Sequence, residues 1–135
     1  MTMDYAEILR GEVATYDGKD ADIIKLAPEL FDLLSSLLED KRLPKSAKPS
    51  INAAISYFVS PYDPFPEDFH GTWGLIDDVV LAAWVLDALP DAEEVLDDHW
   101  RGAGPVREQL AGVLARKDEL VGDKFASMLE YVGLD

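Results

Sequence analysis

Four aspartates in the middle of the chain have the residue type and close spacing that a divalent-cation site needs: Asp63, Asp68, Asp77 and Asp78. Carboxylate oxygens are the ligands that Mg²⁺ and Ca²⁺ prefer, whereas a neighbouring His70 would join only a softer metal such as Mn²⁺ or Zn²⁺. These four aspartates are therefore the candidate metal ligands. With Asp63, Asp77 and Asp78 holding the ion, and Asp68 or His70 orienting a water molecule, they would serve a metal-dependent hydrolase or phosphotransfer enzyme.

The same aspartates also have a structural interpretation. Asp63 precedes Pro64 and can close an Asx-turn, and Asp77 and Asp78 fall in the first turn of a predicted helix. The helix dipole favours a carboxylate there by about 0.3–1 kcal/mol. Repulsion among the carboxylates would then be relieved by basic residues from elsewhere in the chain. We expect Arg101 to be the first such partner, and the others are Arg107, Lys41, Arg42, Lys45 and Lys48.

The sequence offers little other catalytic chemistry. It has no cysteine, which excludes thiol nucleophiles, disulfides and iron–sulfur clusters. It has no nucleophile elbow, no glycine-rich phosphate loop and no HExxH motif. His99 follows two aspartates, but adjacent residues on a helix do not face one another, so we interpret it as a surface or capping histidine. We predict neither a catalytic residue nor a cofactor, with a bound divalent cation as the alternative.

The aspartates surround a segment that is rich in proline and aromatic residues. Residues 61–74 contain three prolines, two glycines and four aromatic side chains. No helix can run through such a segment, and its aromatic side chains favour an ordered loop. Trp73 is the tryptophan best placed to serve a surface groove. The candidate binding residues are Asp63, Phe65, Asp68, His70 and Trp73.

Helical periodicity dominates the rest of the chain, and residues 75–89 are apolar almost all round, which predicts a central buried helix. Pro28 predicts either a kink or the start of a second helix, and Asp20 is expected to cap a helix. Asp91 and Glu94 are spaced as a capping box. We predict an all-α fold, a compact bundle of roughly six or seven helices around a central helical hairpin, in a single domain over residues 1–135.

One segment resembles a known family. Residues 57–78 combine a helix end that is followed by Ser-Pro, an Asp- and Pro-containing loop, and a Gly-x-x-Asp-Asp helix start. This order is similar to that of the YkvA-type domain of unknown function, with Glu67 inserted where the family has Pro followed directly by Asp. The resemblance implies a helical hairpin over residues 43–89, with no established reaction. The matching residues are Tyr57, Phe58, Ser60, Pro61, Asp63, Pro66, Asp68, Phe69, Gly74, Asp77 and Asp78.

Charge is distributed unevenly along the chain. The net charge is −15, and residues 49–100 contain eleven Asp and Glu but no Lys or Arg. A field of this sign repels nucleic-acid phosphates and anionic lipid head groups, so we expect no nucleic-acid partner. No apolar run approaches the roughly 20 residues of a membrane span, and the N-terminus does not resemble a signal peptide. We therefore expect a cytoplasmic protein.

These observations favour a non-enzymatic interaction or regulatory module. Its acidic face would dock a basic or amphipathic protein partner, or a second copy of the chain. The alternative is the divalent-metal-dependent hydrolase or phosphotransfer enzyme that uses Asp63, Asp68, Asp77 and Asp78. A third hypothesis is an acidic decoy that imitates DNA.

Overall fold

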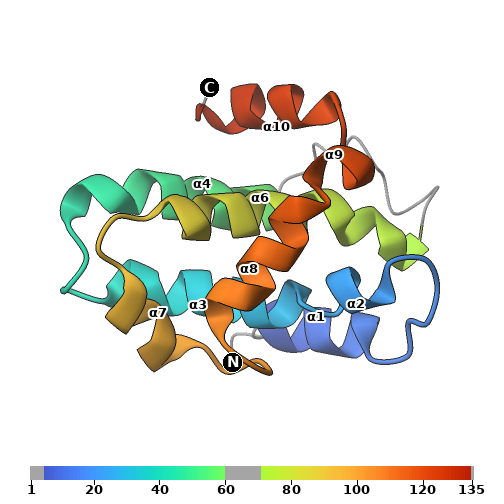
Figure 1. Ribbon diagram of the computed structural model, residues 1–135, viewed down its shortest axis with the longest axis horizontal. Coiled ribbons are helices and arrows are strands. Elements are labelled where there is room, and N and C mark those ends of the chain that lie inside the picture. The colour runs from blue at the N-terminus through green and yellow to red at the C-terminus, as the bar shows by residue number, and fades with distance from the viewer. Residues whose placement is uncertain (1–4, 60–70, 135) are drawn as a thin grey trace.

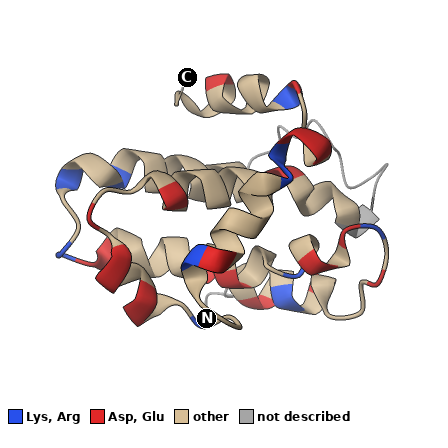
Figure 2. Ribbon diagram, viewed as in Figure 1, with Lys and Arg blue, Asp and Glu red and all other residues tan. Residues whose placement is uncertain are grey.

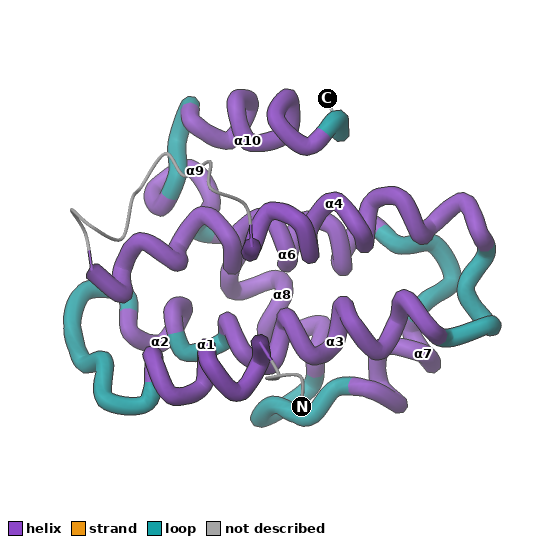
Figure 3. The backbone as a smooth tube through the Cα atoms, turned by 180° about the vertical axis from the view of Figure 1, so that it is seen from behind, coloured by secondary structure: helices purple, strands orange, loops and turns teal. Residues whose placement is uncertain are grey.

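The computed structural model describes residues 5–59 and 71–134, and these residues form helices and loops without a strand (Figures 1 and 3). This confirms the predicted all-α fold. Among the described residues, seven helices have seven or more residues, while α2 and α9 are single turns. This number is close to the predicted six or seven helices. The elements are α1 (Tyr5–Val13), α2 (Ala21–Ile24), α3 (Ala27–Glu39), η1 (Lys45–Ala47), α4 (Lys48–Val59), η2 (Gly71–Leu75), α6 (Ile76–Ala88), α7 (Glu93–His99), α8 (Val106–Ala115), α9 (Lys117–Leu120) and α10 (Lys124–Val132).

Helix α6 forms the centre of the bundle. Nearly all of its side chains are buried, and it packs against α3, α4, α8 and α10. A helix that is apolar all round is stable only when its neighbours cover every side, so this is the central helix that the sequence predicted. Within residues 5–59 and 71–134, no helix combines the length and the apolarity that crossing a bilayer requires.

Helices α4 and α6 lie side by side and form the middle layer (Figures 1 and 3). Helices α1, α2 and α3 lie along one side of this pair, and α10 lies along the opposite side. Helix α8 crosses α6 and packs against it. The two helices on either side of residues 60–70 are therefore held between neighbours on both faces.

The sequence made predictions about three helix starts. The structure agrees with the prediction at Pro28 and differs from it at Asp20 and Asp91. Pro28 lies in the first turn of α3, so the pattern breaks into two helices and does not kink. Asp20 takes the N-cap position of α2, but its backbone is left-handed (φ 58°) and its side chain makes no capping hydrogen bond. The predicted capping box is wrong, because α7 begins at Glu93 and its N-cap is Ala92.

A lysine at the start of α4 caps the C-terminal end of α3. Lys48 Nζ donates hydrogen bonds to the carbonyl oxygens of Leu37 (2.9 Å) and Asp40 (2.8 Å). The last carbonyls of a helix lack intrahelical partners, and a cation there also complements the helix dipole. Lys48 therefore joins the end of α3 to the start of α4.

Candidate functional site

Asp77 is buried at the start of α6 and accepts a hydrogen bond from α4. Its exposed fraction is 0%, and the hydroxyl of Tyr57, itself 1% exposed, donates to Asp77 Oδ2 over 2.7 Å. A hydrogen bond to a buried carboxylate is among the stronger side-chain interactions in proteins. The pair therefore links the last turn of α4 to the first turn of α6. The sequence placed Asp77 in the first helical turn but did not identify Tyr57 as its donor.

Asp78 is the second aspartate of this turn and is only 7% exposed. The free N–H groups and the dipole at the start of α6 favour negative charge here. Arg101, which we expected to be the first partner of these carboxylates, is exposed and forms no ion pair within the described part of the chain. That expectation was wrong: Asp77 accepts a hydrogen bond from Tyr57 of α4, and Arg101 forms no ion pair with either aspartate.

The other predicted site residues, Asp63, Phe65, Asp68 and His70, lie outside the described residues. In residues 5–59 and 71–134, no three His, Asp or Glu side chains are close enough together to hold a metal ion. A cation bound at Asp77 and Asp78 would therefore need further ligands, which can be water molecules or the predicted ligands outside the described residues. The metal site stays a prediction.

Trp73, the predicted binding residue on η2, is half-buried and anchored by the chain before α2. Its Nε1 donates a hydrogen bond to Asp20 Oδ2 over 3.0 Å, and Lys19 Nζ lies 5.2 Å from the centre of its ring. Arg116, at the end of α8, donates to the other oxygen of Asp20. One carboxylate thus connects α2, η2 and the α8–α9 junction.

The contacts of Asp20 also determine its ionisation. Partial burial would by itself raise the pKa of Asp20, but the hydrogen bonds from Trp73 and Arg116 and the charge of Arg116 outweigh it. The pKa is lowered as a result. Asp20 is therefore ionised at neutral pH, with its charge compensated locally.

A group of exposed carboxylates surrounds α7, and we call it the α7 acidic surface (Figure 2). Arg42 contacts Asp98 (2.6 Å) and Glu94 (3.8 Å). Arg107 contacts Asp87 (3.2 Å) and Glu93 (3.0 Å). Two of the predicted basic partners thus pair with this surface. The α7 acidic surface consists of Asp87, Asp91, Glu93, Glu94, Asp97 and Asp98.

Two carboxylates of the α7 acidic surface remain without an ion pair within residues 5–59 and 71–134. Asp91 and Asp97 are both exposed, and no described lysine, arginine or histidine lies within ion-pair distance of either. Asp91 has a left-handed backbone (φ 52°), which places it in a sharp turn before α7. Internal pairing therefore leaves this surface with a negative excess.

His99 attaches α7 to the end of α3. Its Nε2 lies 2.8 Å from Asp40 Oδ2, and Arg42 Nη2 contacts the same oxygen at 2.8 Å. Hydrogen bonds from Arg42 and His99 hold the pKa of Asp40 well below its usual range. The histidine thus has a structural partner at the surface, in keeping with our interpretation of it.

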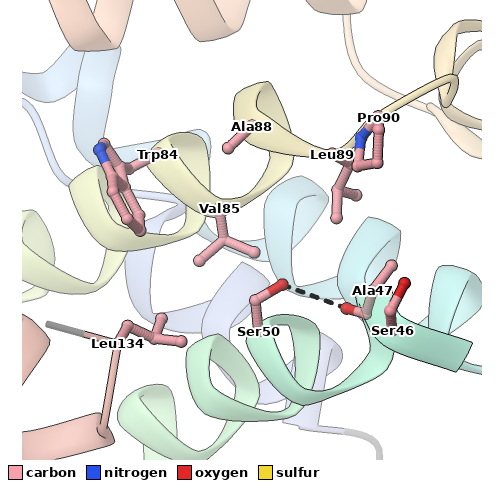
Figure 4. Close-up of a pocket in the computed structure, with 9 residues that line it drawn as sticks. All are labelled: Ser46, Ala47, Ser50, Trp84, Val85, Ala88, Leu89, Pro90 and Leu134. Carbon is pink, nitrogen blue, oxygen red and sulfur yellow. Dashed lines mark hydrogen bonds between the residues drawn. The ribbon is translucent and has the colours of Figure 1, made fainter.

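A pocket of about 240 Å³ opens where the end of α6 meets the start of α4 (Figure 4). Its walls are mostly apolar: Trp84, Val85 and Leu89 come from α6 and the residue after it, and Leu134 comes from the segment after α10. We call it the α4–α6 pocket. It lies at the end of the α4–α6 pair away from Tyr57 and Asp77. No sequence pattern indicated it, because its walls come from distant segments.

Comparisons with known proteins identify similar sequences without a known activity. Residues 47–84 match the family model described as a protein of unknown function (DUF1232). Uncharacterized protein ORF9 of Methanothermobacter thermautotrophicus is 30% identical over 126 residues, which cover 92% of this chain and 86% of that protein. No solved structure matches the chain at a significant level. The DUF1232 domain of unknown function lies within residues 43–89, where the resemblance to the YkvA-type domain was found.

Proposed function

We propose that this chain, which belongs to the same family as uncharacterized protein ORF9 of Methanothermobacter thermautotrophicus, is a non-enzymatic interaction module. Its α7 acidic surface docks a basic segment of a protein partner. The observation that carries this proposal is the negative excess around α7, where six exposed carboxylates face two arginines.

The existing ion pairs do not prevent such docking. Arg42 and Arg107 are partly exposed, and exposed ion pairs of this kind each contribute about 0–1 kcal/mol. Lysines and arginines of a partner can therefore contact Asp91 and Asp97 first and then share the paired carboxylates. Complementary charge of this kind accelerates association and selects the partner by sign.

Fluorescence anisotropy with a labelled lysine–glycine peptide tests the proposal. We expect the peptide to bind at low salt and to dissociate as the salt concentration rises. The double variant Asp91→Asn/Asp97→Asn should bind several-fold more weakly. Asparagine tolerates the left-handed backbone at position 91, so this variant is expected to fold.

A matched control removes the same number of aspartates elsewhere. Asp17 and Asp123 are exposed and lie outside the α7 acidic surface, so Asp17→Asn/Asp123→Asn changes the net charge equally. It should leave most of the affinity intact. Equal weakening by both double variants would show that binding follows the net charge alone, and absence of peptide binding would refute the proposal.

Metal binding is the second candidate function, and the burial of Asp77 and Asp78 favours it. The two side chains are adjacent in the first turn of α6, and carboxylate oxygens are the ligands that Mg²⁺ and Ca²⁺ prefer. Calorimetric titration with Mg²⁺, Mn²⁺ and Ca²⁺ tests this. Saturable heat that disappears in a folded Asp78→Asn variant would support a metal site, and no heat with any of the three ions would eliminate it.

A further inference from the structure

We infer that the α4–α6 pocket is the anchor site for the basic segment and accepts one aromatic side chain from it. The inference rests on the proposed function and specifies the partner: a peptide with one aromatic residue flanked by lysines or arginines. The aromatic ring enters the pocket while the basic side chains lie on the α7 acidic surface.

The size and chemistry of the pocket suit an aromatic ring. An apolar cavity of about 150 Å³ can hold benzene, so a pocket of about 240 Å³ has room for a phenylalanine side chain. Val85, Leu89 and Leu134 supply aliphatic walls. The hydroxyl of Ser50 already donates a hydrogen bond to the carbonyl of Ala47 (3.1 Å), so it does not require a polar ligand (Figure 4).

Two walls of the pocket are held in place by the fold itself. The ring of Trp84 meets Phe125 of α10 edge to face, with 5.6 Å between ring centres. The amide of Leu134 donates to the carbonyl of Leu129 over 2.8 Å after Gly133 has turned the chain through a left-handed conformation (φ 79°). A pocket with fixed walls loses little conformational entropy when a ligand enters, which favours binding.

The pocket continues directly into the α7 acidic surface. Leu89 and Pro90 line the pocket, and the exposed Asp87 and Asp91 stand on either side of them in the chain. The turn after α6 therefore supplies both a part of the apolar wall of the pocket and the first carboxylates of the α7 acidic surface. Strong interfaces commonly combine a central apolar anchor with a polar rim. Here the rim is negative on the side of Leu89 and Pro90, whereas Lys45 and Lys48 flank the opposite wall. The ligand that complements the negative side is an aromatic residue with basic neighbours that extend toward α7.

Three labelled peptides separate the role of the pocket from that of the charge. The first contains lysines and glycines, the second replaces one central glycine with phenylalanine, and the third has the phenylalanine but no lysine. We expect the second peptide to bind at least tenfold more tightly than the first, which corresponds to about 1.4 kcal/mol. The third should bind much more weakly than the second.

A pocket-filling variant supplies the decisive comparison. Ala88 is exposed and lines the pocket, so Ala88→Leu should fill it without changing the charge of the protein. We expect this variant to lose the advantage of phenylalanine and to bind the lysine–glycine peptide as before. The control Ala111→Leu, at an exposed alanine of α8 away from the pocket, should keep the advantage.

The other possible outcomes of the peptide measurements contradict the inference, and they differ in whether the proposed function stands. Equal binding of the first two peptides, or an advantage of phenylalanine that survives Ala88→Leu, would overturn the inference and leave the proposed function standing. Tight binding of the third peptide would show that the pocket acts without basic residues and would also overturn it. If none of the peptides binds, the proposed function fails together with the inference.

Discussion

Tyr57 and Asp77 show how strongly one hydrogen bond can act when both of its partners are buried. Replacing Tyr57 with phenylalanine removes the hydroxyl that donates to the Asp77 carboxylate and changes the size of the side chain very little. We expect Tyr57→Phe to lower the free energy of unfolding by about 1–3 kcal/mol, because water cannot replace the lost donor at a buried site. Urea unfolding followed by circular dichroism measures the change.

Tyr16→Phe is the matched control for this prediction. The hydroxyl of Tyr16 also donates one hydrogen bond, to the carbonyl of Lys19, but at an exposed position. Water can take over that bond, so the change should stay within about 0.5 kcal/mol. Similar losses in the two variants would show that the burial of Tyr57 and Asp77 is not what gives their contact its strength.

Asp20 should make the stability of the protein depend on pH in acid. Because its pKa is lower in the folded protein than in the unfolded chain, its charge stabilises the fold above about pH 4, and this stabilisation is lost as the pH falls through the folded pKa. Asp20→Asn removes the charge and retains a residue that tolerates a left-handed backbone. We expect it to be less stable than the parent at pH 7, with a difference that shrinks below pH 4.

Unfolding curves of both proteins at a series of pH values measure this difference. The comparison cancels the general effect of protonating the many other carboxylates. Asp17→Asn, at an exposed residue, serves as the control and should show only a small difference at any pH. A difference for Asp20→Asn that stays constant down to pH 2.5 would contradict the role assigned to the Asp20 charge.

The sequence predicted where the site aspartates lie along the chain better than it predicted their partners. It placed Asp77 and Asp78 in the first turn of a helix, because position in a helix depends on local pattern. It did not predict the donor Tyr57, which is 20 residues away, or the contact of Trp73 with Asp20, which spans 53 residues. Such pairs depend on how helices pack, which a single sequence does not state.

Among the elements, the junction of α3 and α4 depends on Lys48. Lys48→Met retains the aliphatic part of the side chain and removes the ammonium group that donates to two carbonyls at the end of α3. We expect a loss of about 1–3 kcal/mol in the free energy of unfolding. Hydrogen exchange should also show faster opening of the last turn of α3. Lys45→Met, at an exposed lysine, should change little, and equal effects of both variants would contradict the capping role.

Helix boundaries were predictable where the chemistry is local. The apolar run of α6 fits only a buried helix, so this helix was present in the sequence. At Pro28 the sequence allowed a kink or a new helix, and the structure places the proline in the first turn of α3. The capping box at Asp91 and Glu94 had the right spacing but failed, because Asp91 turns left-handed and the helix begins two residues later. The α4–α6 pocket was not predictable at all, since it depends on where α10 ends.

The whole molecule carries a net charge of −15, and its self-repulsion should weaken the fold at low ionic strength. We expect the melting temperature to rise by about 4 °C between about 20 mM and about 300 mM NaCl, equivalent to about 1 kcal/mol. The exposed ion pairs of Arg42 and Arg107 lose strength in the same range but contribute less. Differential scanning calorimetry measures the change.

A variant with four fewer aspartates, Asp17→Asn/Asp91→Asn/Asp97→Asn/Asp123→Asn, should gain less from added salt than the parent. A melting temperature that falls as salt is added would mean that internal ion pairs outweigh repulsion.

The helical architecture itself followed from composition and periodicity, whereas the location of the negative excess required the positions of Arg42 and Arg107.

The three tryptophans occupy three different environments, which gives the protein its own spectroscopic reporter. The indole N–H groups of Trp73 and Trp100 are held by Asp20 and by the carbonyl of Gly104, while Trp84 forms a wall of the α4–α6 pocket. After incorporation of fluorotryptophan, the ¹⁹F resonance of Trp84 would therefore report ligand binding in the pocket. The resonances of Trp73 and Trp100 would serve as internal references. Occupancy could then be followed in solution without attaching a dye to the protein.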